Sequence, residues 1–373
     1  MGLVSGEGAP ESRNVDRVTF GRGSLSQLSG IVENRRQQAA SCDVDNRTLY
    51  LVDEYFDSRP EAIGGLQVDD RDRLEYVSTA KEPTTDGVDE LVQLVVQAGF
   101  TSSAIIVGIG GGSTLDTTKA VANLLANGGE AAVYQGWDLV PGPAVYKIGV
   151  PTISGTGAEA SRTCVMKNPR TGVKLGMNSE YSVFDHLVLD PELTSTVPRD
   201  QFFFTGMDTF CHCIESLSGK NRHPLGDAFS REAVELVRRV FHSKDMMAVA
   251  EREQLMAASY LGGSAIAMSH VGLVHPFSAG LSMVLGIHHG MANCIALSAL
   301  GDYYPAERNE LFEMADRQSV TIPLGVCDGL NENQFQALFD ATIVHEKPLS
   351  NALGDGFRDE LTLERVTSIF QRM

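Results

Sequence analysis

The chain has 373 residues, of which 43% are apolar, and this length exceeds what a single hydrophobic core usually supports. Its 48 acidic and 30 basic residues give a formal charge of -18, which argues against nucleic acid as a partner. No apolar run reaches the roughly 18 residues of a membrane span, and the start lacks the basic and apolar regions of a secretory signal. We therefore expect a cytoplasmic protein of two domains that acts on small molecules.

The first half of the chain has the pattern of an α/β domain. Residues 1–16 are polar and are expected to be loose, and an alternating strand, RVTF, follows at Arg17. A second strand lies in RTLYLVDEYF, a helical pattern covers 88–99, and an aliphatic strand in SAIIVGI ends in glycines. Because strands and helices alternate, we predict a Rossmann-like parallel sheet over residues 17–197.

The second half is expected to be all helical. The turn-rich segment LVLDPELTSTVPRDQ separates the halves, and we place the domain boundary near Pro198. Helical patterns then cover about 200–218, 224–242, 249–270, 271–284 and 290–300, with weaker ones to the end. Residues 198–373 are therefore predicted to form a second, helical domain.

A glycine-rich turn follows the strand predicted at residues 104–109. Gly110, Gly111 and Gly112 precede Ser113 and Asp116, which have the spacing of a capping box at a helix start. Glycines let the backbone approach a phosphate, and the free N–H groups of a helix start attract its charge. We expect a pyrophosphate site, although Ser113 replaces the third glycine of the usual dinucleotide motif and a tight turn alone explains the pattern too.

Asp53 ends the second predicted strand. A carboxylate at this position binds ribose hydroxyls and repels a 2′-phosphate, so it favours NAD over NADP if a nucleotide binds. A solvated acid at the end of a strand is the alternative.

Four side chains in the second half predict a metal site. Asp208 and His212 are four residues apart in a helical pattern and face the same way, and His275 and His289 follow downstream. One carboxylate and three imidazoles suit Fe(II) or Zn(II), whereas magnesium prefers oxygen ligands. Each half of this set alone is weak evidence, since most single histidines are structural.

Taken together, these segments resemble the iron-containing alcohol dehydrogenase superfamily over roughly residues 17–355. GIGGGSTLDTTKA is similar to its nucleotide loop, PTISGTGAEAS to its second cofactor segment, and GMDTFCHCIES with GLVHPFSAG and HHG to its metal-binding half. The resemblance implies an architecture like that of dehydroquinate synthase, with the site in the cleft between the domains. We also expect a homodimer.

The resemblance also assigns roles by residue. It implies that NAD(H) is held near Asp53, Gly110, Gly111, Gly112, Ser113, Asp116, Thr152, Thr156 and Lys174, and that Fe(II) or Zn(II) is held by Asp208, His212, His275 and His289. The metal would lower the pKa of a primary alcohol whose hydride passes to the nicotinamide.

One position departs from the family pattern. Many members carry a histidine four residues after the first downstream ligand, where this chain has Ala279. His288 and His270 are the candidates for moving the proton instead, although His288 facing solvent without a role is an equal alternative.

A narrower resemblance concerns the substrate. GTGAEASRTCVM, KLGMNS and VGLVHPFSAGLS are similar to the branch containing 3-deoxy-manno-octulosonate 8-oxidase, which oxidises the C8 alcohol of a sugar acid before an aminotransferase acts. Residues 160–179 contain no acid but four basic residues, Arg162, Lys167, Arg170 and Lys174. This local positive charge would attract an anionic substrate, and the planar guanidinium of Arg162 suits a carboxylate. A solvated hairpin with basic flanks explains the same stretch.

Several functions stay open at this point. We expect oxidation of an anionic sugar alcohol, with NAD or oxygen as the acceptor. The alternatives are NAD-dependent turnover of a simple alcohol or aldehyde, a lyase resembling 3-dehydroquinate synthase, and a metal-binding protein without turnover.

Overall fold

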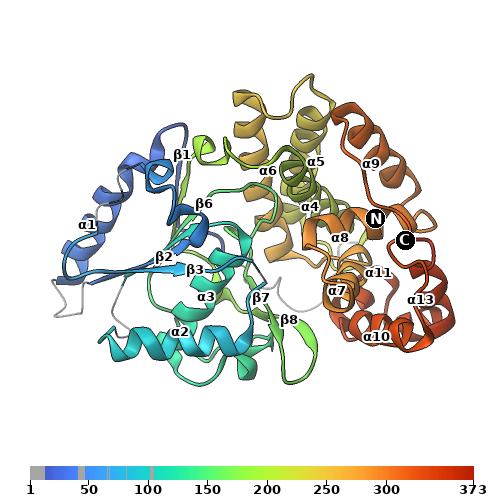
Figure 1. Ribbon diagram of the computed structural model, residues 1–373, viewed down its shortest axis with the longest axis horizontal. Coiled ribbons are helices and arrows are strands. Elements are labelled where there is room, and N and C mark those ends of the chain that lie inside the picture. Colours follow the sequence, from blue (N-terminus) through green and yellow to red (C-terminus); the bar gives the residue numbers. More distant parts are fainter. Residues whose placement is uncertain (1–12, 41–46, 65, 67, 81, 101–104) are drawn as a thin grey trace.

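The computed structural model describes residues 13–40, 47–64, 66, 68–80, 82–100 and 105–373. Figure 1 shows a half that contains the strands, coloured blue to green, beside a helical half coloured yellow to red. The strands are β1 (Arg17–Phe20), β2 (Thr48–Asp53), β3 (Arg73–Val77), β4 (Ile105–Gly110), β5 (Gly136–Trp137), β6 (Lys147–Pro151), β7 (Thr163–Asn168), β8 (Val173–Asn178) and β9 (His186–Leu189). The helices of this half are α1 (Leu28–Ala40), α2 (Thr85–Gln97) and α3 (Gly112–Asn127).

Six strands form a parallel sheet in the order β1-β9-β6-β4-β2-β3. Successive side chains of a strand point to opposite faces, so β2 contributes to two cores. Leu49 and Leu51 pack with residues of α2 and α3, whereas Tyr50 and Val52 pack with residues of α1. Helices therefore cover both faces, and the predicted α/β fold with a parallel sheet is confirmed.

The strand order places a crevice between β2 and β4. From β2 the chain continues outward to β3, and from β4 it continues the other way through β6 to β9. Ligands of doubly wound sheets bind where the order reverses, beyond the carboxyl ends of the strands. Asp53 ends β2 and Gly110 ends β4, so both lie at this point.

The helical half packs around one large core that includes Phe202, Phe203, Phe210, Phe241 and Phe277. It contains α4 (Arg199–Ser218), α5 (Pro224–His242), α6 (Val249–Met268), α7 (Val274–Val284), α8 (His289–Ala299), α9 (Pro305–Gln318), α10 (Glu332–Ile343), α11 (Glu346–Leu353), α12 (Phe357–Glu360) and α13 (Leu363–Phe370). The expected helical half is confirmed. In the described part of the chain, no helix is long and apolar enough to cross a membrane.

A second, three-stranded sheet in the order β5-β8-β7 lies where the halves meet (Figure 1). β7 and β8 form an antiparallel hairpin, and the side chains of β7 alternate between half-buried and buried. The Nζ atom of Lys167 on β7 donates to the backbone oxygen of Ser282 on α7, at 3.3 Å. The sequence analysis gave a hairpin as the alternative explanation of the basic stretch at residues 160–179. This hairpin is present, and it contacts the helical half.

Two details differ from the sequence-based expectations. Residues 1–12 lie outside the described residues, but Arg13 pairs with Asp185 at 2.5 Å and Val15 is buried, so residues 13–16 are anchored rather than loose. The predicted capping box is wrong, because α3 begins at Gly112 with Gly111 as its N-cap and without a side-chain cap. Asp116 instead accepts the Val165 N–H at 2.9 Å, which ties α3 to β7.

Candidate active site and metal centre

Three helices of the second half bring the predicted metal ligands together. Asp208 and His212 lie one turn apart on the buried helix α4, His275 lies in the first turn of α7, and His289 begins α8. The ligand atoms of Asp208, His275 and His289 all lie within 4.8 Å of one another. Measured to the Oδ1 atom of Asp208, the Nε2 atoms lie at 3.2 Å for His275, 3.4 Å for His212 and 3.7 Å for His289.

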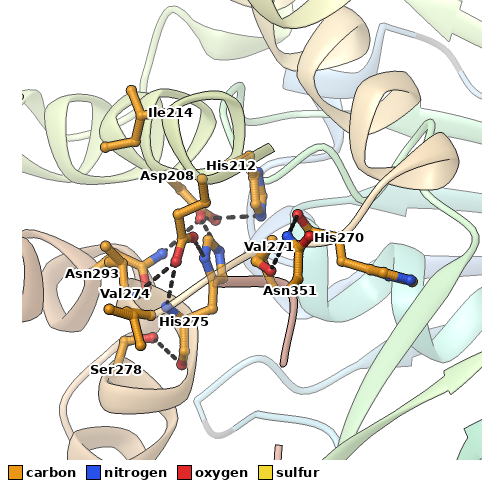
Figure 2. Close-up of polar contacts among 12 residues, drawn as sticks. Asp208, His212, Ile214, His270, Val271, Val274, His275, Ser278, Asn293 and Asn351 are labelled. Atoms are coloured by element: carbon orange, nitrogen blue, oxygen red, sulfur yellow. Dashed lines mark hydrogen bonds and ion pairs between the residues drawn. The ribbon is translucent and has the colours of Figure 1, made fainter. Parts of the chain in front are cut away.

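Figure 2 shows Asp208 at the centre of this group, with the rings of His212 and His275 beside it. Asn293 on α8 donates its Nδ2–H to the Oδ1 atom of Asp208 at 2.6 Å. Because this bond fixes one carboxylate oxygen among the imidazoles, Asn293 positions Asp208 for binding.

The charges of the group suit a cation. Burial lowers the pKa of His212 to about 3, more than the nearby Asp208 carboxylate can offset, so the ring is neutral and keeps a lone pair. Burial opposes the charge on Asp208, but the three histidines outweigh it and hold the pKa of Asp208 below its usual range. Burial acts to lower the pKa of His275, but Glu215 and Asp208 outweigh it and raise this pKa to about 9, so a bound metal would displace a proton from this ring. One ionised carboxylate with three imidazoles fits iron or zinc.

Glu215 orients His275, and the sequence analysis missed it. This fully buried carboxylate lies two helical turns after Asp208 and pairs with the Nδ1 atom of His275. It also accepts the backbone N–H of Val274 at 2.6 Å. A hydrogen on Nδ1 leaves the Nε2 lone pair facing Asp208, so Glu215 selects the tautomer that can bind metal. The acid in GMDTFCHCIES, seven residues after Asp208 on the same helix face, was the available signal.

We expect Glu215→Gln to weaken metal binding by about tenfold to a hundredfold, as loss of such an orienting carboxylate typically does. The substitution keeps the size of the side chain and removes its charge. Competition with a chromophoric chelator measures the dissociation constant directly. Glu235→Gln is the control, because Glu235 is half exposed on α5 and its ion pair among the described residues is with Arg238. An unchanged constant in Glu215→Gln would show that this contact does not orient the ligand.

The glycine turn forms a close cradle beyond β4. A Cβ atom on Gly111 would lie 3.0 Å from the side chain of Ile153, and one on Gly112 would lie 3.2 Å from that of Thr156. Gly111 and Gly112 line the large cavity described below, next to the open first turn of α3. Gly110 does not line the cavity. It faces α3 instead, where an added Cβ would lie 2.5 Å from the side chain of Thr114. Its role is close packing of strand on helix.

The structure brings the other predicted cofactor residues to the same cavity. Asp53 caps a short turn by accepting the Tyr55 N–H at 3.0 Å, and it also accepts the Thr79 hydroxyl at 3.1 Å. The cavity wall includes Asp53, Gly111, Gly112, Ser113, Asp116, Thr152, Thr156 and Lys174. This surface fits a dinucleotide, with backbone N–H groups for the pyrophosphate and a carboxylate for the ribose.

A single cavity of about 790 Å³ joins this surface to the metal-ligand group. Asp208, His212, His275 and His289 line it, and so do the two proton-transfer candidates, His270 and His288. Ala279 also lines it, so the position of the absent family histidine faces the cavity. The arrangement places the reacting ends of a nucleotide and of a metal-bound substrate in one chamber.

The basic stretch is placed differently from what the sequence suggested. Arg162 pairs with Asp138 and does not line the cavity, so the tentative assignment of Arg162 to a substrate anion loses its support. Lys174 and Lys167 do line it, and they share the carboxylate of Glu82 at 2.5 Å and 3.1 Å. Burial raises the pKa of Glu82, but Lys174 first, with His289 and Lys167, lowers it to about 2. Two cations with one carboxylate leave this part of the wall net positive, while Asp53, Asp116 and Asp208 line other parts of the cavity.

The two candidate histidines have different surroundings. His288 is exposed and precedes the ligand His289. His270 has its ring edge-on to Trp137, with centroids 4.8 Å apart, and in Figure 2 it extends away from the ligand group. A third histidine, His345, lines the cavity with a buried Nε2 atom that has no hydrogen-bond partner in the described part of the chain. Nothing in the sequence around it formed a pattern, so His345 was missed.

The second cofactor segment joins the halves through glycines. An added Cβ on Gly155 would lie 1.8 Å from the backbone oxygen of Thr205 on α4, and one on Gly157 would lie 2.8 Å from the Cα atom of Gly263 on α6. Thr209 of α4 also donates its hydroxyl to the Gly155 oxygen at 2.7 Å. We call this contact between residues 155–157 and helices α4 and α6 the glycine seam.

The fold and cavity define a class of protein, in which a nucleotide-binding sheet domain and a metal-binding helical domain share one cleft. Family models support this: the one described as iron-containing alcohol dehydrogenase matches residues 16–191, and that for the C-terminal part of the Fe-containing family matches residues 202–337. The chain belongs to the iron-containing alcohol dehydrogenase family. It is therefore an alcohol or aldehyde oxidoreductase, and the family implies iron and NAD.

Individual relatives agree with this assignment. A sulfoacetaldehyde reductase from Bilophila wadsworthia is 36% identical over 281 residues, which cover 74% of this chain and 70% of the relative. An NAD-dependent methanol dehydrogenase from Bacillus methanolicus is 34% identical over 195 residues, about half of either chain.

Solved structures share the whole fold at lower identity. A sulfoacetaldehyde reductase from Bifidobacterium kashiwanohense in complex with NAD+ has a TM-score of 0.76 at 21% identity, and it covers 96% of this chain and 97% of its own. A 1,3-propanediol oxidoreductase has a TM-score of 0.78, also at 21% identity, with 97% and 98% covered. The likeness in structure confirms the architecture.

Proposed function

We propose that this protein interconverts a primary alcohol and its aldehyde with NAD(H), using Fe(II) or Zn(II), on a substrate with an anionic end. The observation that carries the proposal is the shared cavity, whose wall holds both the ligand group around Asp208 and the glycine turn at Gly111. Hydride transfer needs nicotinamide and alcohol carbon in contact, and a common chamber allows it.

The residues of the chain then have separate tasks. Asp208, His212, His275 and His289 hold the metal, which when bound supplies Lewis acidity toward the substrate oxygen. The first turn of α3 binds the pyrophosphate, and Asp53 binds the ribose and favours NAD over NADP. His288 is exposed next to a ligand, so it is placed to pass the alcohol proton to solvent. The orientation of His270 toward Trp137 makes it the weaker candidate.

Metal removal tests the chemistry. We expect dialysis against a chelator to lower turnover by at least about a hundredfold, since a Lewis acid contributes several kcal/mol to the transition state. Fe(II) or Zn(II) should restore the activity, and Mg(II) should not, because imidazole ligands suit it poorly. Elemental analysis confirms the metal content. Full turnover by demonstrably metal-free protein would refute metal dependence.

The anionic end of the substrate is supported by the charge of the cavity wall. On the part of the wall formed by β7 and β8, Lys167 and Lys174 outnumber Glu82, in a chain whose formal charge is -18. The resemblance to the octulosonate branch suggests the C8 hydroxyl of 3-deoxy-manno-octulosonate. The relative from Bilophila wadsworthia suggests sulfoacetaldehyde as the second candidate. Both compounds combine an anion with a primary alcohol or aldehyde.

A substrate screen separates these candidates. Fe(II)-loaded protein is mixed anaerobically with 3-deoxy-manno-octulosonate and NAD, with sulfoacetaldehyde and NADH, and with 1,3-propanediol and NAD, while the absorbance of the reduced cofactor is followed. We expect the highest kcat/KM for one of the two anions. A preference for the neutral diol would refute the anionic end. A parallel set of assays is run in air and followed by aldehyde formation, and aldehyde formed only in that set would identify oxygen as the acceptor.

A further inference from the structure

Lys347 differs from the other cations around the cavity. Arg162 is paired with Asp138, and Lys167 and Lys174 are paired with Glu82. Lys347 also lines the cavity and is exposed to solvent, so we call this part of the cavity its mouth; within the described ranges no carboxylate lies at ion-pair distance from Lys347. Its ammonium lies 4.0 Å from the centroid of the Trp137 ring. An unpaired cation is thus held at the mouth of the cavity in a strongly acidic protein.

The ring of Trp137 gives this ammonium a fixed place. Attraction between a cation and an aromatic face restricts a lysine that would otherwise move freely in solvent. The other edge of the cluster is His270, whose ring meets Trp137 at 88°. Burial, followed by the charges of Lys347 and Arg162, lowers the pKa of His270 to about 4, so its ring is neutral and carries one N–H donor.

The backbone under His270 is also fixed. Asn351, which is fully buried on α11, donates to the backbone oxygens of His270 at 2.9 Å and Val271 at 3.0 Å (Figure 2). Lys347 lies on the same helix, and Trp137 lies on β5. Three elements therefore hold a cation, a donor and an aromatic face together. The Nδ1 atom of His270 is buried and has no partner among the residues that the structure describes.

We propose that Lys347, Trp137 and His270 form a subsite that binds the carboxylate or sulfonate end of the substrate, while the alcohol or aldehyde end reaches the metal ligands. We call it the mouth subsite. This inference rests on the proposed function and adds the residues that select the anion. A carboxylate or sulfonate matches an ammonium and an N–H donor, and the hydrocarbon part of the substrate can pack on the indole.

Kinetics with matched substrates test the mouth subsite. The ω-hydroxy acids 3-hydroxypropanoate, 4-hydroxybutanoate and 6-hydroxyhexanoate, with 2-hydroxyethanesulfonate, are compared with diols of equal length in wild type, Lys347→Met and Lys347→Arg. We expect Lys347→Met to raise KM for the acids of matching length by about three- to tenfold, between the value of an exposed ion pair and that of a charged hydrogen bond. The KM for the diols should change less than twofold. Lys347→Arg should keep most of the preference for acids over diols, because it keeps the positive charge.

The single tryptophan of the chain provides a readout that needs no turnover. Trp137 is the only source of indole fluorescence, so titration with the same acids reports binding beside its ring. We expect a saturable change whose dissociation constant rises by the same factor in Lys347→Met. The control Lys244→Met removes an exposed lysine elsewhere and should match wild type in both measurements.

The outcomes separate the two proposals. If wild type turns over neither acids nor diols, the proposed function fails, and the fluorescence titration still decides the subsite. The mouth subsite is refuted if Lys347→Met binds the acids as tightly as wild type, or if its KM rises by the same factor for acids and diols. In either case the oxidoreductase function stands.

Discussion

His275→Ala is expected to purify without a full complement of metal and to lose about a thousandfold in turnover, the scale of a lost Lewis acid. His275 contacts two other members of the ligand group: its Nε2 is 3.2 Å from Asp208, and its ring stacks on that of His212 with centroids 4.5 Å apart. Its removal also leaves the buried carboxylate of Glu215 without its ring partner. Metal per chain and formation of reduced cofactor are the two measurements.

A second histidine variant controls for the substitution itself. His242 is exposed near the end of α5, and His242→Ala should retain both metal and turnover. Circular dichroism and thermal melting establish that each variant is folded. A folded His275→Ala protein with full metal content and wild-type turnover would remove His275 from the ligand set.

Gly155→Ala is expected to lower the free energy of unfolding by at least about 4 kcal/mol, the range of the most damaging single substitutions. The backbone of Gly155 has a φ of +128°, which only glycine adopts readily, and the new Cβ would lie 1.8 Å from a backbone oxygen. Neither that oxygen nor α4 can give way without disturbing the helix that carries Asp208.

Gly172→Ala is the matched comparison. Gly172 also has a positive φ, +68°, but it lies at the turn of the β7–β8 hairpin with nothing within 4 Å of an added Cβ. Gly172→Ala should lower the free energy of unfolding by only about 1–2 kcal/mol, which is the penalty of the left-handed conformation. Urea unfolding of both variants measures the difference. Equal midpoints would mean that the close contact at Gly155 is unimportant.

The sequence predicted the local parts of the site well and the long-range parts only through resemblance. Asp208 and His212 share a helix, so their spacing alone placed them on one face. His275 and His289 lie on two further helices, and no local pattern says that these meet α4. The parallel sheet followed from alternating strands and helices, because that alternation has few other solutions.

Charge partners were the part that could not be predicted. The basic stretch suggested an anion site at Arg162, but Asp138 and Glu82 come from other segments and pair with its residues. Lys347 and Trp137 meet although nothing near either one indicates the other. The helix start at Gly112 was missed by two residues, since the predicted N-cap was Ser113 and the observed one is Gly111. A capping box and an uncapped glycine turn have similar sequences.

The glycine seam limits how the cleft can move. At Gly155 and Gly157 the sheet half and the helical half touch with no room for a methyl group, so sliding between them would break backbone contacts. A rotation of one half about this contact would keep those backbone contacts, and it would leave the nucleotide turn and helix α4 at nearly constant separation.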